Sequence, residues 1–272
     1  MQPDLSTFKN HYIDTSVGQL HYAEQGMGKP ILLLHQTPRS FDEFRELIPL
    51  LARDNRVIAM DMYGFGRSTK FPTPHSIEQY AEGAIALTKA LKLSRINLLG
   101  HHTGSLVALE VAATQPDLIE NLIISSLPFT DAAYREAHKD GEGVDDAITQ
   151  PDGSHLVEFW AKRTPLYPPS RPDLLNRFIH DALNFGLDPV EGHLACARYV
   201  IENKISRVVC PTLVIGSGKD PYSYPQVDQV CASLTNSARV EKRIIDQGMV
   251  PLMEMYPEEV ATVVTEFLAG VS

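Results

Sequence analysis

Residues 96–105 read INLLGHHTGS, an apolar run that enters a tight turn with glycine at both ends and leaves it as a helix. The run INLL has the continuous hydrophobicity of a strand that is buried on both faces. Residues 103–116, TGSLVALEVAATQP, remain apolar and contain good helix formers, which predicts a buried helix. The turn therefore joins an internal strand to a core helix, and His102 stands at its centre.

Strand patterns recur on both sides of this turn. Two short strands are predicted in HYIDTSVGQLHYAEQG with a turn at Gly18, followed by buried strands in PILLLHQ and RVIAMD. Downstream, similar runs occur in ENLIISS, PTLVIGSG and VEKRIID. Together with the strand that enters the turn, these segments predict an α/β fold with a doubly wound, mostly parallel sheet of eight strands.

Helices are expected between these strands. Apolar residues at helical spacing predict one helix over residues 40–54, and Ser76 with Gln79 forms a capping box that opens another. A further helix is expected near Pro225, and a last one begins at Pro257. This alternation with the strands is typical of helices that cover both faces of a sheet.

Residues 129–205 break the alternation. This segment lacks buried strand patterns and is rich in helix formers, aromatic residues and proline. We expect a helical cap here, inserted into a core domain formed by residues 1–128 and 206–272. Such a cap covers the carboxyl ends of the strands, where ligands bind in doubly wound sheets.

The composition of the chain narrows the classes of partner. With 272 residues, 43% of them hydrophobic, and a net charge of −10, the chain has enough material for one buried core and an acidic surface. Nucleic acid and anionic membranes are therefore not expected as partners, whereas a small-molecule substrate is. The N-terminal residues lack a signal-peptide pattern, no apolar run reaches the roughly 20 residues of a membrane helix, and the three cysteines show neither zinc nor disulfide spacing. We expect a cytoplasmic protein, for which a homodimer remains open.

Four motifs in order carry a resemblance to a known family. They are HQTP at residues 35–38, DMYGFGRS at 61–68, GHHTG at 100–104, and a distal pair consisting of Asp220 and the Gly248-Met249 dipeptide. In these motifs the chain resembles the α/β-hydrolase superfamily, in particular its capped branch of haloalkane dehalogenases, epoxide hydrolases, carbon–carbon bond hydrolases and related esterases. The resemblance implies an α/β-hydrolase fold with an inserted cap.

The resemblance also implies roles for single residues. The backbone amides of Thr37 and Thr103 correspond to the family's oxyanion hole, and Asp220 corresponds to the acid of its catalytic triad. GHHTG matches the nucleophile elbow, but His102 stands where the family has its serine. Met249 stands where the family has its histidine, and Gln36 replaces a usual glycine. The DMYGFGRS motif shapes a loop, and no catalytic role is expected for it.

The paired changes point to altered chemistry at the elbow. The central residue of this turn needs a positive φ angle, which histidine adopts more readily than most side chains. The outer nitrogen of His102 is expected within reach of a substrate, with Asp220 orienting the ring directly or through water. Such a site suits proton abstraction beside a carbonyl group, activation of water against an acyl group, or carbon–carbon cleavage.

Several other roles remain open at the elbow. A nucleophilic imidazole is one, and a pocket that binds without catalysis is another. Ser105 lies in the first turn of a buried helix, where we expect it to bond the backbone. The cluster of His35, His101 and His102 resembles a metal site, but neighbouring residues of a turn point apart, so neither a metal nor a cofactor is expected. His101 fits better as a histidine whose ring nitrogens are both satisfied by protein groups.

The cap is expected to determine which substrate binds. It supplies Trp160 and Tyr167 to the pocket, together with other aromatic residues that mostly pack the cap onto the sheet. The remaining pocket residues are expected to be His35, Gln36, His101 and Met249. Five further side chains are candidates for binding a polar group of the substrate: Arg39, His155, His180, His193 and Arg198.

These features predict an enzyme with an atypical, non-serine site. We expect it to act on a small hydrophobic ester, lactone or other carbonyl compound by acid–base chemistry of His102 beside a backbone oxyanion hole. A lyase or decarboxylase on the same fold, and a relative that binds a ligand without turning it over, are the alternatives.

Overall fold

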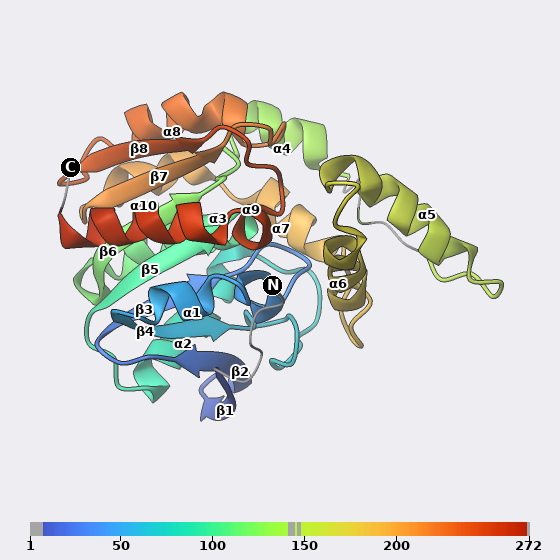
Figure 1. The fold of residues 1–272 in the computed structure, drawn as a ribbon, viewed down its shortest axis with the longest axis horizontal. Helices are drawn as coiled ribbons and strands as arrows, with labels where there is room; N and C mark the ends of the chain where they lie inside the picture. Colours follow the sequence, from blue (N-terminus) through green and yellow to red (C-terminus); the bar gives the residue numbers. More distant parts are fainter. Residues whose placement is uncertain (1–7, 141–144, 146–147, 271–272) are drawn as a thin grey trace.

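The structure is a computed structural model that describes residues 8–140, 145 and 148–270. It is built on one eight-stranded sheet with helices on both faces (Figure 1). The order across the sheet is β1-β2-β4-β3-β5-β6-β7-β8. The strands are β1 (Lys9–Thr15), β2 (Gly18–Gln25), β3 (Lys29–Leu34), β4 (Asn55–Met60), β5 (Ile96–His101), β6 (Ile119–Ser125), β7 (Thr212–Ser217) and β8 (Val240–Ile245). The predicted eight-stranded α/β sheet is confirmed.

Strands β3 to β8 pair in parallel, whereas β1 and β2 join the sheet in antiparallel pairs. Alternate residues of β3 enter the two layers of the core, as the twofold period of a strand requires. Leu32 and Leu34 pack in the layer with α2 (Ile77–Ala90) and α3 (Thr103–Thr114). Their neighbours in sequence pack in the opposite layer, with the last helix α10 (Pro257–Ala269).

The predicted helix over residues 40–54 is wrong as one continuous helix. The chain forms a 3₁₀ turn, η1 (Phe41–Phe44), and then a single α-helical turn, α1 (Ile48–Leu51). Pro49 explains the break, because it has no N–H to donate to the carbonyl of Arg45 and its ring would collide with that carbonyl. The helical spacing of apolar residues is nevertheless real, since their side chains face the core in both pieces.

Other elements follow the expected order. The Ser76 hydroxyl accepts a hydrogen bond from the amide of Gln79 at 3.2 Å and caps α2. Asp61, in the DMYGFGRS loop, accepts hydrogen bonds from the amides of Phe41 and Arg67 at 2.8 and 2.7 Å, so its observed contacts are structural. The remaining elements of the core are η2 (Pro116–Leu118), η6 (Tyr224–Gln226), α8 (Val227–Ser233) and α9 (Leu252–Met255).

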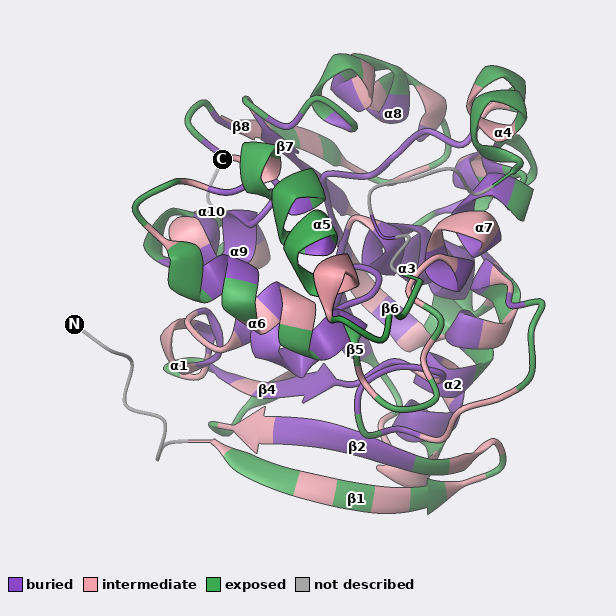
Figure 2. Cartoon of the chain, turned by 90° about the vertical axis from the view of Figure 1, so that its right-hand side faces the viewer, coloured by how far each residue is buried: buried purple, intermediate pink, exposed green. Residues whose placement is uncertain are grey.

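Between β6 and β7 the described residues form helices and turns. The α-helices are α4 (Ala132–His138), α5 (Ser154–Arg163), α6 (Pro172–Ala182) and α7 (Glu191–Arg198), and the 3₁₀ turns are η3 (Thr164–Leu166), η4 (Ile201–Asn203) and η5 (Ile205–Arg207). Helices α5 and α6 share a small apolar cluster of their own that includes Phe159 and Phe178. They extend beyond the sheet, and α5 exposes its outer face (Figures 1 and 2). No helix in the described ranges is long and apolar enough to cross a membrane.

Candidate active site

The turn after β5 has the strained geometry of a nucleophile elbow. His102 has φ 47° and ψ −117°, so its backbone lies at positive φ, as the sequence predicts. A Cβ atom on Gly100 would lie 2.1 Å from the carbonyl oxygen of Gly104, and one on Gly104 would lie 2.0 Å from that of Leu34. Both positions therefore require glycine because backbone segments cross there. The crossing directs the His102 side chain away from the sheet and toward the inserted helices.

His102 and Asp220 come together in the structure, although 118 positions separate them in the sequence. The Nε2 atom of His102 lies 2.9 Å from Oδ2 of Asp220, an ion-pair distance, although the two groups are not aligned as a linear hydrogen bond. Asp220 also accepts hydrogen bonds from the Ser223 hydroxyl at 2.7 Å and the Tyr222 amide at 2.9 Å. Burial alone would raise the pKa of Asp220, but His102 and these donors hold it well below its usual range. Asp220 is therefore an anion at neutral pH.

The two nitrogens of His102 have different surroundings. An ionised Asp220 favours a proton on the nearby Nε2, which leaves the lone pair of neutral imidazole on Nδ1. No residue in the described ranges hydrogen-bonds Nδ1, and the side chain is 12% exposed at the wall of a cavity. The outer nitrogen was expected to meet the substrate, but in the structure Nε2 is buried against Asp220.

Two backbone amides lie beside His102 without protein acceptors. Thr37 and Thr103 both line the cavity, and within the described part of the chain neither N–H donates to a protein group. Thr103 is the first residue of α3, so its amide belongs to the unpaired donors of a helix N-terminus. Gln36, beside Thr37, is held in place because its amide N–H and side-chain nitrogen both donate to Glu43, at 2.8 and 2.5 Å.

A cavity of about 500 Å³ opens in front of His102. Of the predicted pocket residues, Gln36 lines it, and Met249 instead lines a neighbouring cavity of about 300 Å³ together with Asp220. The two cavities share Pro221 and Val250 as a wall. The rest of the main cavity is lined by Pro128, Tyr134, His138, Arg163, His193, Cys196, Tyr222 and Gln226.

His35 and His101 do not line either cavity, contrary to expectation. His35 bonds the carbonyl of Gln36 through Nδ1 and accepts the amide of Met62 at Nε2, at 2.7 and 2.9 Å. Burial lowers its pKa. His101 contacts the Ser125 hydroxyl and the Val250 carbonyl, both at 3.1 Å, and burial followed by the nearby His102 lowers its pKa to about 3. Both rings are thus neutral structural groups behind the site.

Trp160 and Tyr167 are also absent from the cavity wall. Trp160 is 37% exposed on α5, and Tyr167 is buried against Phe178 in the small cluster of α5 and α6. Both residues were predicted in the pocket because the segment is rich in aromatic residues, a feature that does not show which side chains meet a ligand. Aromatic content therefore identified the packing of these helices and not the contact surface for a ligand.

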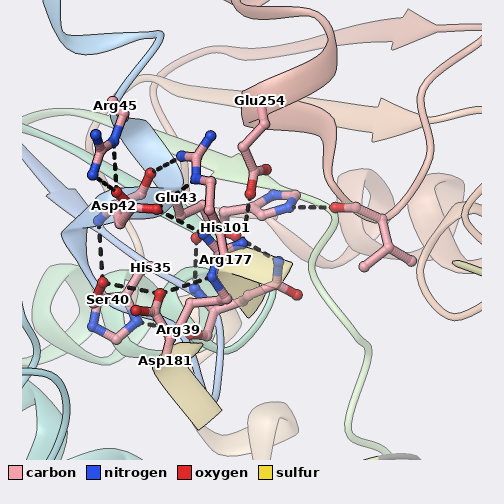
Figure 3. A network of polar contacts seen from close by, with 12 residues as sticks. His35, Arg39, Ser40, Asp42, Glu43, Arg45, His101, Arg177, Asp181 and Glu254 are labelled. Carbon is pink, nitrogen blue, oxygen red and sulfur yellow. Dashed lines mark hydrogen bonds and ion pairs between the residues drawn. The ribbon is translucent and has the colours of Figure 1, made fainter. Parts of the chain in front are cut away.

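Of the five polar candidates, His193 alone lines the main cavity. Arg198 donates to Glu191 at 2.5 Å, and His155 and His180 lie away from the cavity. Arg39 is fully buried and donates to Asp181 at 2.9 Å and Glu254 at 2.5 Å (Figure 3). Tyr134, His138 and Arg163 line the cavity but were not predicted, because no local pattern distinguishes them from surface residues of an amphipathic helix.

Two further expectations can be compared with the structure. The Ser105 hydroxyl donates to the carbonyl of His102, so it bonds the backbone as predicted and does not face the cavity. Within the described ranges, no three or more His, Cys, Asp or Glu side chains are arranged to hold a metal ion. His101 and His102 lie at 80° to one another with ring centroids 4.7 Å apart.

The sequence of the chain matches a known protein family over most of its length. The description "alpha/beta hydrolase fold" matches residues 29–254. The chain belongs to the α/β-hydrolase superfamily. The named relatives of the chain are hydrolytic enzymes, which supports the expectation that the chain is an enzyme of this superfamily.

Individual relatives share parts of the sequence or the whole fold. The chain is 26% identical over 212 residues to an (E)-2-((N-methylformamido)methylene)succinate hydrolase from Acinetobacter baylyi, which covers 75% of this chain and 77% of that protein. It is 36% identical over 132 residues to a haloalkane dehalogenase from Mycolicibacterium paratuberculosis, covering 44% of this chain and 43% of that one. A hydrolase from Pseudomonas aeruginosa superposes with a TM-score of 0.81 at 20% identity, over 96% of this chain and 98% of that chain, which shows a shared fold.

Proposed function

We propose that this α/β-hydrolase uses His102 as a general base in place of a serine nucleophile. In this proposal Nδ1 of His102 removes a proton from water while the water oxygen attacks a substrate carbonyl carbon. The observation that carries the proposal is the contact between His102 and the ionised Asp220 at a retained elbow. A carboxylate on Nε2 both selects the tautomer with a free Nδ1 and stabilises the imidazolium that forms.

The oxyanion would be held by the amides of Thr37 and Thr103. Both donors lie at the cavity wall without a protein acceptor in the described part of the chain. Hydrogen bonds from fixed amides strengthen as the carbonyl oxygen becomes an anion, so they favour the transition state over the substrate. The retention of these donors, despite the changed side chain at the elbow, supports acyl chemistry.

Small esters and lactones are the proposed substrates. A cavity of about 500 Å³ with Pro128, Pro221 and Val250 in its wall fits a compact apolar group. The Acinetobacter relative is named for hydrolysis of an N-methylformamido compound, a carbonyl substrate. Because the match covers 77% of that protein, we take the addition of water to a carbonyl group as the starting hypothesis.

A turnover screen tests this function. Small esters, lactones and β-dicarbonyl compounds are incubated with the native protein, with His102→Ala, and with His180→Ala as a control whose side chain is 80% exposed. Hydrolysis that His102→Ala reduces at least about 100-fold, while the control retains it, is expected for loss of a general base. Equal turnover by both variants would exclude His102 as the base. Cleavage of β-dicarbonyls alone would identify a carbon–carbon lyase instead.

A fluorophosphonate that reacts with activated serine gives an independent test. The native protein should remain unlabelled, because the Ser105 hydroxyl bonds the backbone. Stoichiometric labelling at Ser105, detected by mass spectrometry, would contradict the proposal and identify a serine mechanism.

A further inference from the structure

A second imidazole in the cavity has the same kind of support as His102. His193 lies on α7 and lines the cavity, and its Nε2 contacts Oδ2 of Asp145. Asp145 is fully buried, and its other oxygen accepts a hydrogen bond from Nε of Arg163 at 2.6 Å. Arg163 in turn lies over the ring of Phe178 at 4.2 Å. A carboxylate buried between a guanidinium and an imidazole thus fixes one nitrogen of His193.

The free nitrogen of His193 is available to a ligand. Its side chain is 35% exposed, and no described residue hydrogen-bonds its Nδ1. Burial would raise the pKa of Asp145, but Arg163 and His193 lower it, so the carboxylate stays ionised beside the ring. The arrangement resembles that of His102 and Asp220, although His193 lies on α7 and Asp145 in a turn between β6 and β7.

The other titratable side chains at this end of the cavity either stay protonated at neutral pH or already contact a protein group. Burial raises the pKa of the Tyr134 hydroxyl, and it raises that of the Cys196 thiol to about 11, so both remain protonated at neutral pH. Arg163 is committed to Asp145. His138 contacts the carbonyl of Tyr134 through Nδ1 at 2.8 Å and contacts no described carboxylate. His193 is therefore the imidazole at this end that a buried carboxylate supports.

We infer that His193 is a second catalytic residue of this site and donates a proton to the leaving group. The inference rests on the proposed function. A substrate carbonyl held by the amide of Thr103 would lie next to His102, and its leaving group would have room in the part of the cavity that the inserted helices line. His193 lines that side of the same cavity, with Asp145 stabilising its protonated form.

The proton steps balance for an ester. Water gives one proton to Nδ1 of His102, its oxygen bonds to the carbonyl carbon, and the carbonyl electron pair moves to the oxygen held by the amides. That pair then reforms the carbonyl as the bond to the alkoxy oxygen breaks, and protonated His193 gives its proton to that oxygen. The products are a carboxylic acid and an alcohol. His102 returns its proton to solvent and His193 takes one up, which restores both rings.

Esters with the same acyl group and different leaving groups test this role. A nitrophenyl ester leaves as a stable anion and needs no acid, whereas an alkyl ester needs one. His193→Gln, which retains a hydrogen-bonding group near Asp145, should lower kcat/KM for ethyl acetate about 100-fold and change that for nitrophenyl acetate less than about threefold. Asp145→Asn should give the same selective loss. The matched control is His180→Gln, whose side chain is 80% exposed away from the cavity and which should affect both esters equally and weakly.

The outcomes separate this inference from the proposed function. An equal loss on both esters in His193→Gln, with circular dichroism unchanged, means a structural role and overturns the inference while His102 can remain the base. Loss of both activities in His102→Gln supports the base in the same experiment. A native protein that hydrolyses neither ester overturns the inference for acyl substrates, and the lactone and β-dicarbonyl arms of the screen then decide the proposed function.

Discussion

At the scale of single residues, the elbow keeps its backbone geometry although histidine stands at its centre. The positive φ of His102 is imposed by the crossing of backbones at Gly100 and Gly104 and does not depend on which side chain projects from the turn. A serine there would need a separate base, whereas imidazole is itself a base once a carboxylate orients it. Asp220 supplies that carboxylate in direct contact.

This distinction predicts the outcome of restoring serine. His102→Ser alone should remain inactive and unlabelled by fluorophosphonate, because Met249 provides no base for the hydroxyl. Met249 and Asp220 line the same small cavity, so a histidine at position 249 is placed to meet the carboxylate. The double variant His102→Ser, Met249→His should therefore gain stoichiometric labelling, measured by mass spectrometry. Labelling of the single variant would show that another base activates the serine.

At the scale of secondary structure, the close approach of β3 and α3 forms the platform of the site. Gly104 lies against the carbonyl of Leu34, which leaves no space for a side chain. Gly104→Ala should lower the free energy of unfolding by at least about 3 kcal/mol, because the backbones must separate. The control is Gly270→Ala, at positive φ but in open space, which should cost about 1 kcal/mol. Urea unfolding measures both, and equal losses would contradict the role of the crossing.

The sequence predicted the elements whose patterns are local. The buried strands and α3 follow from continuous apolar runs, and α10 follows from Pro257 and a periodic apolar face. The region of η1 and α1 was predicted as one helix because apolar spacing outweighed the effect of Pro49. Helix α9 was not predicted, since its four residues are too few to show a period.

At the scale of the whole molecule, a buried network of charges joins the core to the inserted helices. Arg39 follows the HQTP loop, Asp181 lies on α6 and Glu254 on α9, and the three meet in one ion-paired cluster (Figure 3). Nearby, burial and the charge of Glu254 raise the pKa of Glu43 to about 8. Because Glu43 bonds Gln36, this cluster supports the loop that carries Thr37.

The raised pKa of Glu43 predicts a pH dependence of stability. Folded Glu43 holds its proton more tightly than the same residue in the unfolded chain, where a glutamate titrates near pH ~4.3. The stabilisation that this proton gives the folded state is therefore complete below that pH and is lost as the pH rises to about 8. The side chain at position 43 cannot titrate in Glu43→Gln, so the variant does not lose this stabilisation. As the pH rises across that window, the free energy of unfolding of the variant should increase relative to that of the native protein by up to about 1.4 kcal/mol per pH unit. Urea unfolding at pH 5.5 and 7.5 measures the difference.

The control for this prediction is Glu136→Gln, whose side chain is 73% exposed. Its stability should follow that of the native protein at both pH values. A constant difference between Glu43→Gln and the native protein would mean that Glu43 does not take up a proton on folding in this range.

The candidate site could be predicted only in the parts that lie in motifs. His102, Asp220 and the two threonine amides occupy motif positions. The structure places His102 and both threonines at one cavity, with Asp220 in contact with His102 at the neighbouring cavity. Asp145, Arg163 and His193 come together only after the inserted helices fold, over separations of 18 and 48 residues. Arg39 pairs with groups 142 and 215 residues away. Such contacts depend on tertiary packing, so the residues that form them show no recognisable spacing pattern in the sequence.

We propose that His102, and not a serine, carries the chemistry of this site. The most direct measurement is kcat/KM for one hydrolysed ester in His102→Gln and Ser105→Ala, compared with the native protein. We expect a loss of at least about 100-fold in His102→Gln and a change of less than about threefold in Ser105→Ala. Loss of activity in Ser105→Ala with retention in His102→Gln would contradict it.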